Sequence, residues 1–159
     1  LYAQFRLEEA WDGPHNQSLL ARMPKVFAPP PVDDLEVEPY TTFYQAIVGG
    51  GTAFEGGKEL KLSDFRDGTA NTLLVVEARQ AVPWTKPADV PYAVNRPVPQ
   101  LGGIFHSKGR FSLFGANRQV GFGAVFADGS VRFLRADLPE ATLRGLITRN
   151  GGEKLGDDW

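Results

Sequence analysis

Hydrophobic and polar residues alternate most cleanly across residues 122–134, on both sides of the dipeptide Asp128-Gly129. This dipeptide is typical of a two-residue type I′ turn, because both of its residues must tolerate a positive φ. Pairing outward from the turn sets Phe126 opposite Val131 and predicts a β-hairpin whose register is fixed by one apolar face. We expect that face to be buried, and it consists of Phe122, Ala124, Phe126, Val131 and Phe133.

Other apolar segments predict the remaining strands. Residues 41–48 are a strand candidate. The apolar run at residues 73–77 is too short for a typical helix, which indicates a strand buried on both faces. Residues 104–114 are a further candidate for short strands. Prolines recur through residues 82–99, so we predict a long surface loop without regular structure there.

The helical patterns are short. Residues 1–7 resemble the end of an amphipathic helix, and residues 16–23 predict a helix with Asn16 as its N-cap. Consecutive prolines make residues 28–34 extended. Residues 139–148 predict a helix with proline in its first turn, and its apolar stripe consists of Leu143, Leu146 and Ile147. These elements together predict an α+β fold, with a mainly antiparallel sheet, short helices and long Gly/Pro-rich loops.

Composition narrows the possible classes of protein. Of the 159 residues, 42% are apolar, which suits one domain, residues 1–159, with a sizeable core. The net charge of −2 argues against electrostatic binding of nucleic acid. No apolar run approaches the roughly 20 residues that cross a bilayer. The absence of cysteine excludes disulfides, thiol catalysis and thiolate metal sites.

Motifs for catalysis and nucleotide binding are incomplete. The glycine-rich residues 49–57 precede Lys58, but Thr52 stands where a phosphate-binding loop needs its first glycine, and Glu59 follows the lysine. The two histidines lie far apart in the sequence, and neither belongs to a motif with an obvious catalytic nucleophile. We therefore expect no enzyme activity and no bound cofactor. A pair of carboxylates brought together by the fold is the one catalytic route left open.

Oxygen-bearing side chains gather around a second Asp-Gly turn. Asp64, Asp67 and Asn71 fall within eight positions, and hard cations prefer such ligands. Calcium is therefore one interpretation of this segment. The other is that these side chains bond nearby backbone groups, as Asp and Asn usually do in turns.

Aromatic residues offer a possible binding surface. Trp11, Trp84 and Tyr92 lie in or beside predicted loops, where exposed rings can stack on sugars or anchor a partner. The alternative is that these rings cover the sheet.

Six segments, taken in order, are typical of one bacterial family. They are Trp11-Asp-Gly-Pro-His-Asn16, Met23-Pro-Lys-Val-Phe27, Phe65-Arg-Asp-Gly-Thr-Ala-Asn-Thr-Leu-Leu-Val-Val-Glu-Ala78, Val82-Pro-Trp-Thr-Lys-Pro-Ala-Asp89, Leu101-Gly-Gly103 and Phe126-Ala-Asp-Gly-Ser-Val-Arg-Phe-Leu134. With these segments the chain resembles the Domain of Unknown Function 1559 family, also labelled solute-binding family 10, from about Leu1 to Gly151.

Members of this family begin with a type IV pilin-like leader and a hydrophobic helix. The resemblance covers their carboxy-terminal, globular part, so such a helix is either absent or lies upstream of Leu1, and it is the only contact with the membrane that the resemblance implies. The family's signature also places a histidine ten residues before the Asp-Gly dipeptide, where this chain has Arg118.

The resemblance implies a pilin-like globular domain of an exported protein, at the cell surface, in the periplasm or outside the cell. It favours a non-catalytic structural or assembly subunit, resembling a pseudopilin, whose partners are further copies of itself or other envelope and pilus subunits. In pilin-like proteins the N-terminal helix packs on one face of the sheet, and the hairpin face is the candidate for that contact. The alternative function is a carbohydrate- or solute-binding domain that uses Trp11, Trp84 and Tyr92.

Overall fold

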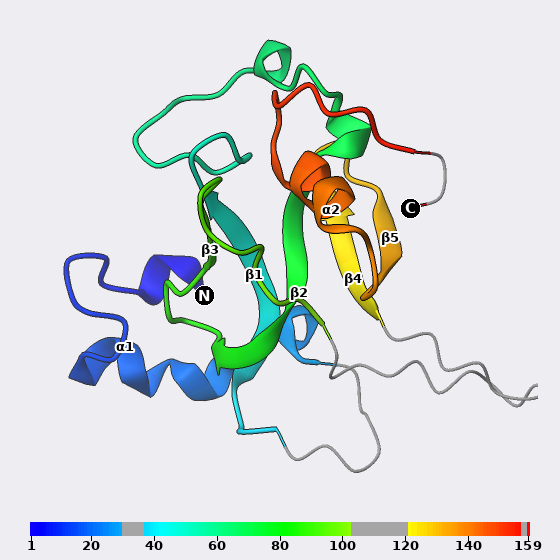
Figure 1. Cartoon of the computed structure of the whole chain (residues 1–159). Coiled ribbons are helices and arrows are strands. Elements are labelled where there is room, and N and C mark those ends of the chain that lie inside the picture. The colour runs from blue at the N-terminus through cyan, green and yellow to red at the C-terminus, as the bar shows by residue number, and fades with distance from the viewer. Residues whose placement is uncertain (30–36, 103–120, 157–158) are drawn as a thin grey trace, which may run out of the picture.

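Five strands form one mixed sheet in the order β3-β1-β2-β4-β5 within the part of the chain that the structure describes (Figure 1). The computed structural model describes residues 1–29, 37–102, 121–156 and 159. The strands are β1 (Thr41–Gly49), β2 (Leu73–Pro83), β3 (Val90–Tyr92), β4 (Gly121–Phe126) and β5 (Val131–Arg135). The α-helices in these ranges are α1 (Pro14–Ser18) and α2 (Glu140–Ile147). The short 3₁₀ helices are Tyr2–Gln4, Leu20–Arg22, Lys25–Phe27, Leu62–Asp64 and Thr69–Asn71. The fold is α+β.

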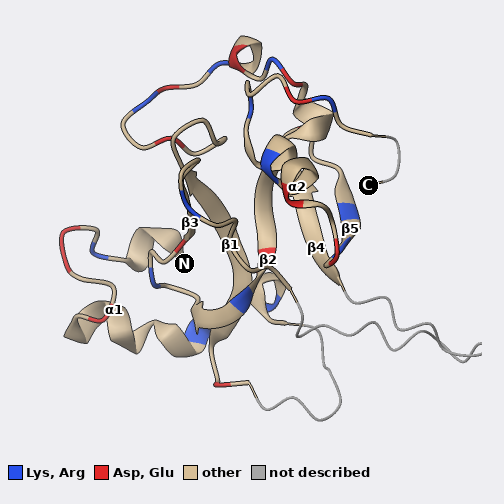
Figure 2. Cartoon of the chain, in the orientation of Figure 1, with Lys and Arg blue, Asp and Glu red and all other residues tan. Residues whose placement is uncertain are grey.

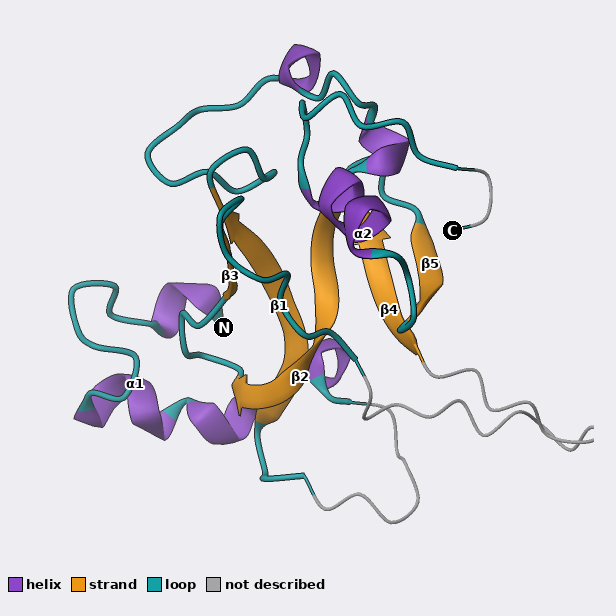
Figure 3. Cartoon of the chain, viewed as in Figure 1, coloured by secondary structure: helices purple, strands orange, loops and turns teal. Residues whose placement is uncertain are grey.

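The core lies between α2 and one face of the sheet, which we call the inner face (Figure 3). The predicted helix stripe is confirmed, because Leu143, Leu146 and Ile147 are all buried. Opposite it, Val76 of β2 and Phe126 of β4 belong to the same cluster of buried residues. Side chains alternate between the two faces of a strand, so Phe122, Ala124 and Phe126 of β4 all contribute to this core, as do Val76 and Ala78 of β2.

The predicted hairpin forms, but its register differs by one residue from the prediction. Val125, not Phe126, lies opposite Val131. Within the loop, the positive φ occurs only at Gly129, at 84°, and the Phe126 amide donates a hydrogen bond to the Ser130 carbonyl at 2.9 Å. This is a three-residue loop with a glycine bulge rather than a type I′ turn. The extra loop residue shifts β5 by one position against β4.

The shift reverses the two faces of β5. Leu134 is 2% exposed and lies on the inner face, whereas Phe133 is 46% exposed and Val131 is 74% exposed. The prediction that Val131 and Phe133 are buried is therefore wrong, and the prediction for Phe126 is confirmed. The Asp128 carboxylate accepts a hydrogen bond from the Ser130 amide at 2.8 Å, which stabilises the longer loop as an Asx turn does.

The sheet is mixed because β3 runs parallel to β1, with Val48 opposite Pro91. We predicted no regular element in residues 82–99, and the presence of β3 there shows that this was wrong. A proline is tolerated because β3 is an edge strand of the described sheet, where a missing N–H need not break a ladder. β2 is also longer than predicted, and it is not buried on both faces, since Val75 and Glu77 are only half-buried.

The sheet opens between β2 and β4 beyond the pair Val76 and Ala124. There the Gly102 amide donates to the Glu77 carbonyl at 2.9 Å, so another segment takes the place of β4 beside β2. The Gly123 amide at this opening donates instead to the Glu77 carboxylate, at 2.6 Å. Glu77 therefore closes the end of the β2–β4 ladder with its side chain.

The N-terminal segment, residues 1–29, carries α1 and lies beside the ends of β1 and β2 (Figure 1). Asn16 was predicted as an N-cap, but Gly13 occupies that position. Asn16 is buried, and its amide donates to the Arg6 carbonyl at 2.8 Å and to the Ala10 carbonyl at 3.1 Å. Its role is to hold the preceding loop against α1. Most of the predicted extended segment 28–34, all of the predicted strand material at 104–114, and Arg118 lie outside the described residues.

Candidate functional site

The outer face of the sheet carries a row of apolar residues that lie directly opposite one another. Ala46, Val75, Val125 and Val131 are successive cross-strand partners on β1, β2, β4 and β5. We call these four residues the outer row. None of them is buried, and Phe133 stands beside Val131 on the same face of β5. Among the described residues, α2 packs on the opposite, inner face (Figure 1).

Charged residues are sparse on this part of the sheet. β1 and β4 contain none, and most of the blue and red segments in Figure 2 lie outside the strands. A contiguous exposed apolar surface on a folded protein marks an interaction site more often than scattered single residues do. The outer row and Phe133 therefore form a candidate contact surface.

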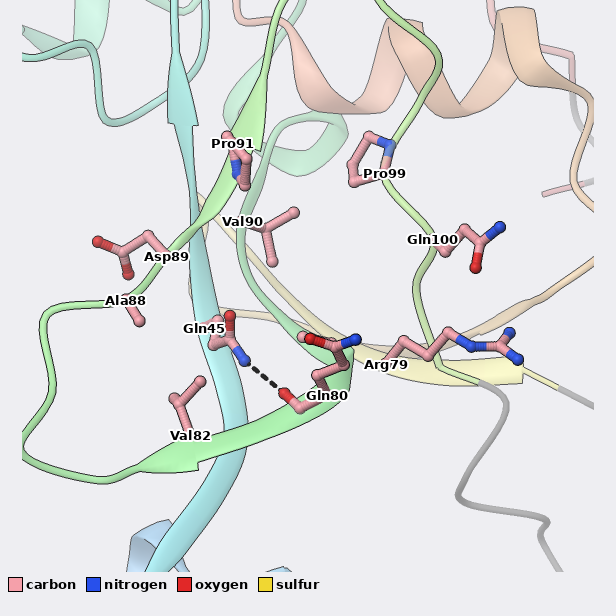
Figure 4. A pocket seen from close by; sticks show the side chains of 11 residues that line it. Gln45, Arg79, Gln80, Val82, Ala88, Asp89, Val90, Pro91, Pro99 and Gln100 are labelled. Atoms are coloured by element: carbon pink, nitrogen blue, oxygen red, sulfur yellow. Dashed lines mark hydrogen bonds between the residues drawn. The ribbon is translucent and has the colours of Figure 1, made fainter.

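A second candidate is a cavity of about 450 Å³ beside β3 (Figure 4). It exists because β2 bulges away from β1. The pairing changes from Tyr44 with Glu77 to Thr42 with Val82, so residues 78–81 of β2 lie opposite a single residue of β1. Such bulges leave the ladder locally disrupted and can aim side chains into a site.

Two amide side chains, Gln45 and Gln80, help to line this cavity. Gln45 projects from β1 into the bulge, and its Nε2 donates to the Gln80 carbonyl at 2.7 Å (Figure 4). Val82 and Val90 form apolar walls, and Asp89 and Arg79 also line the cavity. In Figure 4, Asp89 and Arg79 lie toward opposite sides of the Gln45 and Gln80 amides.

The residues proposed to bind calcium bond mostly to backbone amides. The two carboxylate oxygens of Asp67 accept hydrogen bonds from Gly151 at 2.7 Å and from Gly152 at 3.0 Å. Asn71 donates to the Asp67 carbonyl at 2.9 Å, and Asp64 accepts from the Lys61 amide at 2.8 Å.

The contacts of Asp64 and Asn71 are the local ones that the turn interpretation describes, whereas the Asp67 carboxylate joins the segment to the chain that follows α2. Within the described ranges, no group of three or more His, Asp or Glu side chains is arranged to hold a metal ion.

The predicted aromatic residues contact other parts of the chain. The Trp84 ring stacks on Phe27, with 5.6 Å between ring centroids, and meets Phe5 edge-on at 5.8 Å. Its Nε1 also donates to the Leu20 carbonyl at 2.9 Å. Trp84 thereby fastens the N-terminal segment to the end of β2.

Trp11 and Tyr92 differ in their surroundings. The Lys86 ammonium lies 5.7 Å from the centre of the Trp11 ring, so Trp11 and the segment around Trp84 are in contact. Tyr92 is buried in the core at β3, and no described ring contact joins it to either tryptophan. The structure thus brings together two of the three predicted aromatic residues, and none of the three lines the cavity of Figure 4.

Arg149 forms a buried junction that sequence reasoning missed. It is 6% exposed, and its guanidinium donates to the Thr52 carbonyl at 2.6 Å and to the Glu55 carboxylate at 2.7 Å. Hydrogen bonds from Lys58 and then Arg149 lower the pKa of Glu55 from 4.5 to about 2. This junction holds the glycine-rich loop, residues 49–57, against the segment that follows α2. Its members lie too far apart in the sequence for any local pattern to predict it.

Comparison of the chain with models of known protein families, with curated proteins and with solved structures finds no match. The resemblance to the Domain of Unknown Function 1559 family therefore stays a prediction. Among helices formed by the described residues, none combines the length and the apolar composition that crossing a membrane requires.

Proposed function

We propose that this chain is the globular part of an exported, pilin-like assembly subunit and that its outer row contacts another subunit. The observation that carries the proposal is the outer row itself, together with Phe133. Four strands contribute apolar side chains to one surface that is half-buried at Ala46, Val75 and Val125 and exposed at Val131. Helix α2 packs on the other side of the sheet. The family resemblance supports the same role, because it implies a structural or assembly subunit.

Covering this surface would contribute free energy of association. Burying one valine or phenylalanine side chain contributes about 1.5–3 kcal/mol relative to leaving it in water. Val131 is the most exposed member of the outer row, at 74%. We therefore expect most of the gain at β5, where Val131 and Phe133 stand side by side on the same face.

The absence of cysteine allows a clean test by site-specific cross-linking. The variant Val131→Cys, labelled with a benzophenone maleimide and irradiated, should form a covalent dimer or a cross-link to another envelope subunit. Leu62→Cys is the matched control, because Leu62 is 77% exposed but lies away from the sheet. The experiment should be done in cells that export the full-length protein, as well as with the purified chain. Equal cross-linking at both positions would contradict the proposal.

A further inference from the structure

The two edges of the described sheet differ in how they are protected against pairing with another strand (Figure 1). β3, at one edge, is three residues long and has Pro91 in its middle, and both features discourage the addition of a strand. β5, at the other edge, is five residues long and contains neither proline nor glycine. The β5 edge therefore keeps a capacity for pairing that the β3 edge lacks.

Alternate residues of β5 present their backbone groups to the open edge. The Ser130 carbonyl accepts a hydrogen bond from the Phe126 amide at 2.9 Å, so it points toward β4. In an antiparallel pair, successive residues alternate between facing the partner strand and facing away from it. The residues of β5 whose backbone N–H and C=O groups face away from β4 are Val131, Phe133 and Arg135. Within the described part of the chain, these groups have no hydrogen-bond partner at the open edge.

The charged side chains of β5 leave this edge accessible. The guanidinium carbon of Arg132 lies 4.5 Å from the centre of the Phe126 ring and 5.3 Å from that of Trp159, so this charge stands over the inner face. The Arg135 Nε donates to the Asp137 carboxylate at 3.0 Å, which pairs the second charge beside the end of the strand. Neither arginine therefore blocks a second strand in the way that charges on an edge commonly do.

We infer that β5 pairs in the antiparallel direction with β5 of a second copy of this chain, and that a twofold axis passes beside Phe133. The inference rests on the proposed function and specifies how the β5 end of the outer row meets its partner. All three outward-facing residues of each copy then form hydrogen-bonded pairs across the junction. The two Phe133 rings lie opposite each other, as aromatic cross-strand pairs favour. The contact is isologous, so it closes as a dimer.

The charge pattern of β5 selects this register. With Phe133 at the axis, each arginine stands opposite an apolar residue of the second copy. The pairs are Arg132 with Leu134 and Arg135 with Val131. A shift by two residues in one direction sets Arg132 opposite its own copy, and like charges directly opposite each other are destabilising. A shift by two in the other direction moves Val131 past the end of the facing strand. β5 is thus self-complementary in one register, which favours a second copy over an unrelated strand.

Disulfide formation tests the register, because the chain has no cysteine of its own. Full-length Phe133→Cys, oxidised in cells with diamide, should form a covalent dimer on non-reducing electrophoresis. The Cα atoms of a hydrogen-bonded antiparallel pair are about 5.5 Å apart, within the range of disulfides.

Val131→Cys is the matched control, because Val131 is more exposed than Phe133, at 74% against 46%. Alone it should form no disulfide, since its own copy lies roughly 14 Å away along the strand, four residues at about 3.4 Å each. Co-expressed Val131→Cys and Arg135→Cys chains should link to each other. A disulfide in Val131→Cys alone that equals the one in Phe133→Cys would overturn the inference.

Amide hydrogen exchange tests the pairing in the native sequence. When about nine-tenths of the purified chains are dimeric, exchange at the amides of Val131, Phe133 and Arg135 should slow about tenfold, because only the monomeric tenth leaves them open. The amides of Arg132 and Leu134, which face β4, should not change. Contact through the outer face alone covers side chains and leaves the edge amides open, so unchanged exchange in the dimer would overturn edge pairing.

Failure of this inference differs from failure of the proposed function. Photo-cross-linking at Val131 without a disulfide in Phe133→Cys would overturn edge pairing and leave the proposed function standing. The absence of both the photo-cross-link and the disulfide would overturn both.

Discussion

The inner and outer rows of the sheet consist of neighbouring residues on the same strands, yet they have different surroundings. The inner row consists of Gln45, Val76, Ala124 and Arg132. Each of these residues is the sequence neighbour of one residue of the outer row. The first three residues of the inner row are buried. The outer row is more apolar than the inner row, but it is the more exposed of the two.

This contrast shows that apolar composition alone does not identify which face of the sheet packs in the core. The inner row tolerates Gln45 because the β2 bulge supplies a hydrogen-bond acceptor. It tolerates Arg132 because the guanidinium lies over the Phe126 ring, 4.5 Å from its centre. Helix α2 lies on the inner face and does not cover the outer row. The apolar residues of the outer row are therefore available for the contact proposed above.

The largest effect should come from truncating the inner face. Phe126→Ala should lower the free energy of unfolding by about 3–5 kcal/mol, because it leaves a cavity in a close-packed core. Phe133→Ala, the same truncation on the outer face, should cost less than about 1 kcal/mol. Urea unfolding of both variants measures the difference. Similar losses would show that the hairpin register described above is incorrect.

A smaller effect is expected at Glu77, the charged residue on the outer face of β2. Glu77→Ala should cost about 1–3 kcal/mol, because it leaves the Gly123 amide without its acceptor at the opening between β2 and β4. Glu59→Ala is the control, since Glu59 is exposed and lies in a loop. Amide hydrogen exchange should accelerate at Gly123 in the first variant only. An unchanged exchange rate would mean that another group supports this amide.

Local sequence patterns could predict the elements but not their pairing. The stripe on α2 and the burial of Phe126 followed from periodicity, because each depends on residues a few positions apart. The hairpin register did not follow, because an Asp-Gly pair suits both a two-residue loop and a longer loop with a glycine bulge. The strand β3 was missed because prolines weaken a strand prediction even where an edge position tolerates them.

The candidate sites were harder to predict, because they depend on contacts between distant segments. Predicting the outer row requires the correct register of three strand pairs. The cavity of Figure 4 requires the β2 bulge, and no local motif indicates that Gln45 will face Gln80. The Arg149 junction likewise joins residues that are close only after folding. Asp67 likewise accepts hydrogen bonds from Gly151 and Gly152, which are distant in the sequence, whereas the turn interpretation expected bonds to nearby backbone groups.

Acid should weaken the Arg149 junction without affecting contacts within either row, because neither row contains a carboxylate. The folded-state pKa of Glu55 is about 2, below its ordinary value of 4.5. Its contribution to stability is therefore complete above pH 4.5 and is lost as the pH falls toward 2. The melting temperature of Glu55→Gln should fall less steeply across this interval than that of the native chain. The control Glu59→Gln should follow the native chain, and an identical slope for Glu55→Gln would exclude this role of the junction.

The smallest effect on stability should come from the outer row itself. Val131→Lys should change the free energy of unfolding by no more than about 0.5 kcal/mol, because the side chain is 74% exposed and leaves no cavity. The same change places a charge on the proposed contact surface, where desolvating an unpaired ammonium opposes association. We therefore expect the variant to melt like the native chain and to lose its association with other subunits, as measured by sedimentation and cross-linking in cells. The matched control, Leu62→Lys, should keep both properties. A large loss of stability in Val131→Lys would show that the outer row is covered by this chain itself, and the contrast between the two rows would then disappear.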